Sequence, residues 1–254
     1  MVRLTGTSGG IRAYGTASLV TRVGAGGVED FAHVARMLHA APDECGQLQL
    51  AVDLAVRLIG GCDHAGVSMV EGRRISTPAG SDDVVRRGDA LQYELDEGPC
   101  LDSVRWHETV VSQDLSREER WRRWTLRART DLGIKAMMSL WLYTKAHSSG
   151  AHSYGALNLY ADQADAFEPQ DHAIGQALAA QISVALAAQR EIQQRSVAMT
   201  NRSVIGQAEG ILMERLGIDA DEAFAYLRRM SQTENRKLVK ICNEIVELRQ
   251  LPGS

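Results

Sequence analysis

The sequence predicts an α+β domain, then a long connecting helix, then an all-α domain of three helices. Three observations support this prediction. Between residues 62 and 160, short segments of alternating apolar and polar residues are separated by tight turns. From Glu168 to Leu216 a helical pattern continues with no proline after Pro169. From about Ser196 onward the pattern is wholly helical, and the mixture of strands and helices before it is typical of the α+β class.

The composition is that of an ordinary globular protein. The 254 residues are 44% hydrophobic and 24% charged, with a formal net charge of −4. No apolar run approaches the roughly 20 residues needed to cross a bilayer, and the N-terminus lacks a basic segment followed by an apolar core. We therefore expect a cytoplasmic protein with no membrane partner, and the overall charge does not indicate nucleic acid.

The first 60 residues are expected to contain a tail and two helices. Residues 1–28 are rich in Gly, Ser and Thr and predict a flexible tail, because such a segment buries little apolar surface. Apolar residues at helical spacing predict helices within residues 30–60. Pro42-Asp43 separates the two helices, and Gly60-Gly61 ends the second.

The strand-rich part begins with a hairpin. Residues 65–70 alternate, Glu71-Gly72 makes the turn, and residues 73–77 return. Further strands are predicted at residues 110–111, 136–143 and 154–160, with helices at 81–92 and 116–130.

Two runs in this part allow two interpretations each. Residues 96–101 predict a turn at Gly98-Pro99 with Cys100 buried as the next helix begins, or an acidic loop with a reactive thiol over a ligand pocket. In the arginine-rich run 117–129, Trp121 and Trp124 would face inward on a helix and leave the arginines in solvent. Basic residues beside aromatic ones can also bind single strands.

Signatures of catalysis and metal binding are weak. The four cysteines form no Cys-x-x-Cys pair, and no two of the seven histidines have the spacing of a helical metal site with a neighbouring acid. We expect reduced thiols, no metal, no cofactor and no catalytic residues.

The long helix carries a heptad-like stripe of mostly apolar residues. At spacings of four and three it contains Leu178, Ile182, Ala185, Gln189, Ile192, Ser196 and Met199. This pattern predicts a helix that leaves its domain and pairs with a second copy. The alternative is a helix packed on its own domain.

The last part reads as three short amphipathic helices. Gly217 ends the first, Asp219-x-x-Glu222 has the form of a capping box that starts the second, and Thr233 or Asn235 is expected to cap the third. Positive and negative residues balance here, but five cations gather where the second helix ends and the third begins: Arg228, Arg229, Arg236, Lys237 and Lys240. They predict a phosphate-binding surface, and the alternative is a surface that only aids solubility.

Three motifs in this part resemble the ANTAR domain, the RNA-binding domain of bacterial antitermination regulators. Residues 204–215 resemble its first helix, residues 223–229 its second, and residues 231–238 the start of its third. The resemblance implies a three-helix domain that is active as a dimer. It further implies binding to paired short stem-loops in nascent mRNA, which prevents a terminator hairpin; the bases of loops are open to stacking and readout.

The resemblance also assigns roles to particular residues. The family's polar and basic surface is matched by Arg228, Arg229, Asn235, Arg236 and Lys237, to which the charge pattern adds Lys240. Its packing positions are matched by Ala208, Gly210, Ala223 and Phe224, beside Leu227 from the apolar face of the second helix. Two residues depart from the family pattern: Glu209 stands where Lys is frequent and would repel phosphate, and Cys242 stands where Ala is usual.

The preceding region resembles the GAF domain that accompanies ANTAR in regulators of the actinobacterial type. The matching stretches are residues 96–102, 110–115, 120–121, 155–160 and 166–167. The resemblance implies an antiparallel sheet flanked by helices, used as a small-molecule or redox sensor. The sequence has no convincing set of cyclic-nucleotide contacts, no clear haem ligand and no chromophore-attachment signature.

Together these features predict a flexible tail over residues 1–28, a GAF sensor domain over 29–167, a connecting coiled-coil-like helix over 168–195 and an ANTAR RNA-binding domain over 196–250. We expect a homodimer that is not an enzyme and that binds mRNA stem-loops under the control of an unidentified small molecule. One alternative is a GAF-type thiol reductase acting on oxidised methionine, which needs Cys62 and Cys100 near each other. The other is a DNA-binding dimeric regulator.

Overall fold

The computed structural model describes residues 27–146 and 150–248. The predicted tail lies outside these residues except for its last two, which open helix α1 (Gly27–His39). Helix α2 (Glu44–Leu58) follows, as the helical spacing predicts. Asp43 separates the two helices and also caps α2, because its side chain accepts a hydrogen bond from the Gly46 N–H at 2.8 Å.

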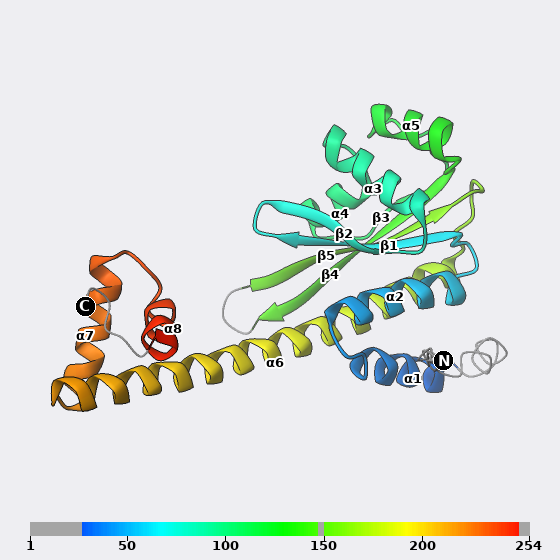
Figure 1. Cartoon of the computed structure of the whole chain (residues 1–254). Coiled ribbons are helices and arrows are strands. Elements are labelled where there is room, and N and C mark those ends of the chain that lie inside the picture. The colour runs from blue at the N-terminus through cyan, green and yellow to red at the C-terminus, as the bar shows by residue number, and fades with distance from the viewer. Residues whose placement is uncertain (1–26, 147–149, 249–254) are drawn as a thin grey trace, which may run out of the picture. The chain divides into compact units, whose positions relative to one another are not determined.

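Five antiparallel strands form one sheet in the order β2-β1-β5-β4-β3 (Figure 1). Their bounds are β1 His64–Glu71, β2 Arg74–Gly80, β3 Val110–Ser112, β4 Ala136–Ala146 and β5 Gly150–Ala161, which confirms the predicted strands and lengthens them. The central strands β1 and β5 approach closely at Gly155. A Cβ built there would lie 1.8 Å from the Ser68 carbonyl oxygen, and its φ is +151°, so only glycine fits this crossing.

Helices cover both faces of the sheet (Figure 1). Helices α3 (Asp83–Leu95), α4 (Pro99–Trp106) and α5 (Arg122–Leu132) lie on one face, and α2 with the first part of α6 (Pro169–Leu216) lies on the other. The expectation of a helix from Ser116 is wrong for its first six residues, since α5 begins at Arg122. Before it, Asp114 Oδ1 accepts from the Ser116 N–H at 2.8 Å, and Glu118 Oε1 accepts from the Arg120 N–H at 3.0 Å; such local bonds compete with a helix.

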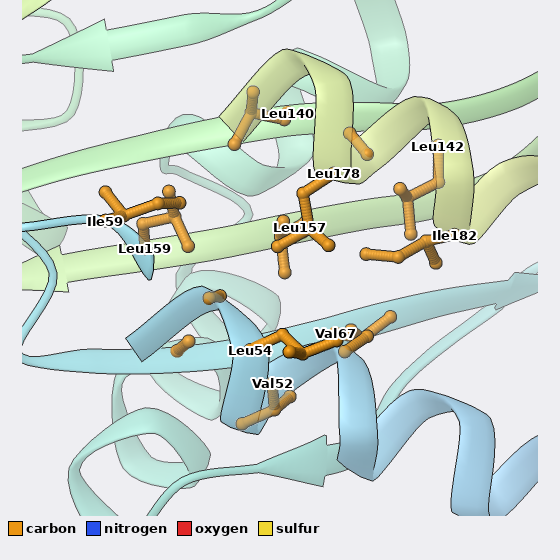
Figure 2. Close-up of a cluster of buried hydrophobic side chains, with 14 of the residues drawn as sticks. Val52, Leu54, Ile59, Val67, Leu140, Leu142, Leu157, Leu159, Leu178 and Ile182 are labelled. Atoms are coloured by element: carbon orange, nitrogen blue, oxygen red, sulfur yellow. The ribbon is translucent and has the colours of Figure 1, made fainter. Parts of the chain in front are cut away.

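The core below the sheet joins α2, α6 and the inner strands (Figure 2). Leu178 and Ile182 of α6 face Leu140 and Leu142 of β4, and all four side chains are buried. The first part of the predicted stripe therefore packs on its own domain, which corrects the expectation that the whole stripe pairs with a second copy. Further along α6 the stripe is in solvent, with Ile192 57% and Met199 74% exposed.

The core above the sheet contains both tryptophans of the arginine-rich run. Trp121 and Trp124 are buried and meet edge to face, with ring centroids 6.4 Å apart. Each indole N–H is bonded: Trp121 donates to Asp102 Oδ2 at 2.8 Å, and Trp124 donates to the Gly88 carbonyl at 3.1 Å. The inward-facing tryptophans are confirmed, and the neighbouring arginines Arg122 and Arg123 are exposed.

The described residues divide into two compact units with the border between Ala187 and Ala188. The second unit contains the end of α6, α7 (Ala220–Thr233) and α8 (Leu238–Leu248). Its core consists of Ala208, Leu212, Ala223, Leu227, Ile241, Cys242 and Ile245. Nowhere in residues 27–146 and 150–248 is a helix both long enough and apolar enough to span a membrane.

The sequence predicted the junction between α6 and α7 correctly, but not the junction between α7 and α8. Gly217 follows α6 with a φ of +66°, and Asp219 with Glu222 forms the predicted capping box. The expected cap of the third helix is wrong, because α7 continues to Thr233 and α8 begins only at Leu238. The Ser231 hydroxyl donates to the Arg236 carbonyl at 2.6 Å, and the Arg236 N–H donates to the Ser231 carbonyl at 3.1 Å, so these bonds fix a longer turn.

Candidate functional sites

The turn between α7 and α8 carries most of the predicted RNA-binding cations. Arg228 and Arg229 lie in the last part of α7, and Lys237 and Lys240 lie at and just inside the start of α8. All four side chains are exposed. Among the residues that the structure describes, Arg228, Lys237 and Lys240 have no ion-pair partner, while the Arg229 guanidinium lies 5.7 Å from the centre of the Tyr226 ring. This group of four is called the turn cations below.

Arg236 differs from the turn cations. Its guanidinium Nη1 lies 3.0 Å from Glu234 Oε2, and Nη2 pairs with the Glu244 carboxylate. The hydrogen bonds from Arg236 hold the pKa of Glu244 below its usual value, and the two carboxylates raise the pKa of Arg236. Asn235, next to it, is exposed and has a φ of +52°, a conformation that asparagine tolerates in turns. Arg236 therefore braces the turn, and its charge is offset.

The predicted packing residues fall into two groups. Ala208, Ala223 and Leu227 are fully buried in the three-helix core. Phe224 is 39% exposed, and a Cβ built on Gly210 would meet no atom within 4 Å. Within one chain, Gly210 and Phe224 thus do not take part in this core, contrary to the expectation from the resemblance.

The two departures from the family pattern are neighbours. Cys242 is buried in the three-helix core, and Glu209 is half-buried. Burial raises the pKa of the Cys242 thiol, and the Glu209 carboxylate raises it further. Cys242 is therefore a packing residue, and the Glu209 charge lies close to it.

A buried carboxylate forms the centre of a polar cluster between the sheet and α3. Asp89 is fully buried and accepts hydrogen bonds from the Tyr160 hydroxyl, from Thr77 Oγ1 at 2.7 Å and from Asn158 Nδ2 at 2.9 Å. Burial raises the pKa of Asp89 to about 6, although the hydrogen bonds from these neutral groups act to lower it. No Lys, Arg or His among the described residues pairs with it. Asp89 was not among the residues predicted from the sequence, although an acid on the buried side of α3, between Val85 and Gln92, was a visible signal.

The cluster continues to Cys100 through hydroxyl groups. Tyr93 Oη lies 2.6 Å from Ser68 Oγ and 2.8 Å from Thr77 Oγ1. The Cys100 thiol donates to Ser68 Oγ at 3.2 Å, and its backbone N–H donates to Gln92 Oε1 at 2.9 Å. These residues and Asp89, Asn158 and Tyr160 are called the Asp89 cluster below.

The Asp-Glu-Gly-Pro-Cys-Leu run is a structural turn. Gly98 has a φ of +140°, Pro99 is the first residue of α4, and Cys100 is buried, which confirms the interpretation of a turn before a helix. Burial raises the pKa of the Cys100 thiol to about 12, so the thiol stays protonated at neutral pH. This does not fit a reactive thiol.

The cysteines required by the reductase alternative do not lie together. Cys62 belongs to the core below the sheet and Cys100 to the core above it. Burial also raises the pKa of Cys62 to about 12. Across the described ranges, no group of three or more His, Cys, Asp or Glu residues could hold a metal ion.

The chain thus contains a five-stranded antiparallel sheet with helices on both faces, followed through one long helix by a small helical unit. The sequence model of the GAF domain matches residues 46–187, more than half of the chain, and the chain belongs to this family. The model of the ANTAR domain matches residues 193–246. The protein is therefore a GAF domain followed by an ANTAR domain, and these regulatory domains fit a protein that is not an enzyme.

Solved structures similar to this chain were also found, and two of them are as follows. Free methionine-R-sulfoxide reductase from Neisseria meningitidis, in complex with its substrate, is similar with a TM-score of 0.51 and 13% identity, covering 71% of this chain and 95% of that one. The GAF domain of a phosphoenolpyruvate-protein phosphotransferase from Acinetobacter has a TM-score of 0.48 and 14% identity, covering 65% and 94%. At 13% identity, the likeness to the reductase from Neisseria meningitidis concerns the fold alone. Among curated proteins, the sequence has no match.

Proposed function

We propose that this chain is an RNA-binding transcription regulator of the actinobacterial antitermination type. Its ANTAR domain binds paired stem-loops in nascent mRNA and prevents a terminator hairpin. Its GAF domain controls that binding in response to a signal, and the protein acts in the cytoplasm as a homodimer. The observation that carries the proposal is the ANTAR match over residues 193–246 together with the exposed turn cations inside it.

Electrostatics supports a role for the turn cations in binding a polyanion. The chain is acidic overall, with a net charge of −4, so binding to RNA needs a local concentration of positive charge. Arg228, Lys237 and Lys240 offer three guanidinium or ammonium groups that form no ion pair with a described carboxylate, although the Lys240 charge is near enough to Glu244 to help lower the pKa of that carboxyl. Each phosphate contact to a single strand contributes about −0.7 to the slope of log K against log salt. Three contacts therefore make binding strongly dependent on salt.

The test is binding of the full-length protein to its own leader RNA folded into tandem stem-loops, titrated over a range of salt concentrations. The substitutions Arg228→Ala, Lys237→Ala and Lys240→Ala, combined, are expected to reduce the salt slope by about 2 and the affinity at least about tenfold. The control removes three exposed cations of the GAF domain, with Arg73→Ala, Arg74→Ala and Lys135→Ala, and is expected to bind like the wild type.

Two outcomes contradict the proposal. One is the absence of salt-sensitive RNA binding by the wild type. The other is an equal loss of binding in both triple variants, which would mean that total charge rather than the turn cations determines affinity. Duplex DNA, tested beside the hairpin RNA at equal salt, distinguishes the alternative of a DNA-binding regulator, because that alternative predicts tighter binding to the duplex.

A further inference from the structure

Strand β4 is longer than its neighbour β3, and its outer edge is open beyond Ser139. β3 pairs with residues 137–139 alone, and no described strand pairs with β4 on that side from Leu140 onward. At one point α6 reaches this edge, because the Tyr143 N–H donates to Ser183 Oγ at 3.0 Å. A cavity of about 560 Å³ lies along the edge, between β4, the segment 107–109 and α6.

Three of the five α6 residues that line this cavity have small side chains, and the other two are Gln176 and Val184. Leu178 and Ile182 turn into the core below the sheet (Figure 2), where they are buried. The residues of α6 that line the cavity include Ala179, Ala180 and Ser183, which are too short to fill it. Leu178 and Ile182 thus point to the core, and the small residues Ala179, Ala180 and Ser183 leave space beside the strand edge.

Three stacked rings also line the cavity. His107 and Trp141 have ring centroids 4.4 Å apart and planes inclined by 24°, and Trp141 and Tyr143 have centroids 4.0 Å apart and planes inclined by 9°. The Trp141 indole N–H donates to Ser153 Oγ at 2.9 Å, which fixes the central ring. Tyr143 is 39% exposed, so the stack ends at a ring that a further ring can cover.

The charge of the lining restricts the ligand. Among the described residues that line the cavity there is one carboxylate, Glu108, and no Lys or Arg. Such a lining does not neutralise a phosphate or a carboxylate, so an anionic ligand is disfavoured. The cavity volume falls within the range of about 300–1,000 Å³ that is typical of small-molecule sites.

We propose that this cavity, the β4-edge site, binds a planar aromatic small molecule that is uncharged or cationic. The ring of the ligand stacks on Tyr143 and lies against Ala179 and Ala180 of α6. The β4-edge site shares no residue with the Asp89 cluster, and the proposal does not depend on RNA binding. The ligand would contact α6, and α6 continues to Leu216. Ligand binding would therefore act on the same helix that connects the two domains.

The experiment is a calorimetric titration of the full-length protein with three probes. Adenosine is an uncharged heteroaromatic molecule, proflavine is a planar aromatic cation, and adenosine 5′-monophosphate carries the adenosine ring with a negative charge. Adenosine and proflavine are expected to bind saturably below about 1 mM, and the monophosphate to bind at least about tenfold more weakly than adenosine.

Matched variants locate the binding. Ala180→Leu fills the cavity from an exposed position of α6, whereas Ala173→Leu makes the same change on the same helix outside the cavity. Ala180→Leu is expected to weaken adenosine binding at least about tenfold, and Ala173→Leu to leave it unchanged. Tyr143→Leu removes the terminal ring without affecting the backbone bond to Ser183, and it is expected to weaken binding as well.

Three results would overturn the β4-edge site. They are no saturable binding of adenosine or proflavine, monophosphate binding as tight as adenosine binding, and adenosine binding that survives both Ala180→Leu and Tyr143→Leu. Circular dichroism of each variant verifies that it is folded, and since the two variants lie on different elements, α6 and β4, failure of one to fold leaves the other decisive.

Discussion

The guanidinium of Arg236 pairs with the carboxylate of Glu244, a residue eight positions further along the chain and inside α8. The same guanidinium also pairs with Glu234 at 3.0 Å, in the turn that precedes α8. One cation thus holds two carboxylates and ties the turn to the helix. Arg236 contributes to the shape of the RNA-binding surface that we propose, whereas the neighbouring turn cations contribute its charge.

Substitution of Arg236 is therefore expected to act on stability. Arg236→Ala lowers the midpoint of thermal unfolding, because both ion pairs and the brace between turn and helix are lost. Lys237→Ala leaves the midpoint unchanged and weakens RNA binding, because its ammonium group has no described partner. Circular dichroism melts measure the first effect and RNA titrations the second.

Glu244→Gln distinguishes bracing from direct RNA contact by Arg236. If Arg236 braces the turn, Glu244→Gln lowers the melting midpoint in the same direction as Arg236→Ala. If Arg236 contacts phosphate instead, Glu244→Gln frees a cation and tightens RNA binding with no loss of stability. The second pattern would contradict the bracing role.

Asp89 makes the stability of the GAF domain depend on pH. Its folded pKa is raised from 3.8 to about 6, so folding favours the neutral carboxyl group. Its contribution to stability is complete below pH 3.8 and is lost as the pH rises to about 6. Above that pH the buried charge costs about 3 kcal/mol, because a tenfold change in the ionisation constant corresponds to about 1.4 kcal/mol.

Asp89→Asn removes this titration. The variant is expected to be more stable than the wild type by up to about 3 kcal/mol at pH 8, with a difference that shrinks towards pH 4. Urea unfolding across this pH range provides the measurement. Glu94→Gln, an exposed position of the same helix, serves as the control and is expected to follow the wild type. A difference between Asp89→Asn and the wild type that does not vary with pH would disprove the assignment.

Periodicity and turn residues in the sequence predicted most helices and strands, because each depends on local spacing. The hairpin at Glu71-Gly72, the turn at Gly98-Pro99 and the capping box at Asp219 are all local patterns. The start of α5 and the end of α7 were missed, because hydrogen bonds involving Asp114 and Ser231 decide them. Such bonds depend on geometry that a pattern of residue types does not contain.

The candidate sites were less predictable than the fold. The sequence located the turn cations, since charge is visible in composition, but the pairing of Arg236 with Glu244 depends on how α8 packs. The Asp89 cluster draws its members from five separate elements of the chain, β1, β2, α3, α4 and β5. Its assembly follows from sheet order, which local spacing does not determine. The exposure of Gly210 likewise depends on which faces of the three helices meet.

A second pH-dependent group lies at the end of the sheet. His64 Nδ1 lies 2.6 Å from Asp82 Oδ2, and Nε2 lies 3.3 Å from Asp162 Oδ1. Partial burial acts to lower the pKa of His64, but the hydrogen bonds and charges of Asp82 and Asp162 outweigh it, so the pKa is raised above 6.5. The stability that His64 contributes is therefore complete below pH 6.5 and is lost as the pH rises through the folded pKa.

Proton NMR titration of the His64 ring measures this pKa directly. Asp82→Asn is expected to lower it more than Asp162→Asn, because the contact with Asp82 is the shorter one. Asparagine still caps α3 through the oxygen that accepts from the Val84 N–H at 2.8 Å, so the helix is retained. An unchanged His64 pKa in both variants would show that the carboxylates are not its cause.

The exposed part of the α6 stripe provides a test of the proposed homodimer. Met199 is 74% exposed on the stripe, and Val197 is 53% exposed about half a turn around the helix. In a Cys45→Ser background, which removes the exposed native thiol, Met199→Cys is expected to form a disulfide with its counterpart in a second copy under mild oxidation. Val197→Cys is expected to react slowly, because its side chain points away from the partner helix. Equal rates of disulfide formation in the two variants would contradict pairing along this stripe. The rate for Met199→Cys is also measured against protein concentration. If this rate rises at low concentration and then levels off, the dimer forms before the disulfide.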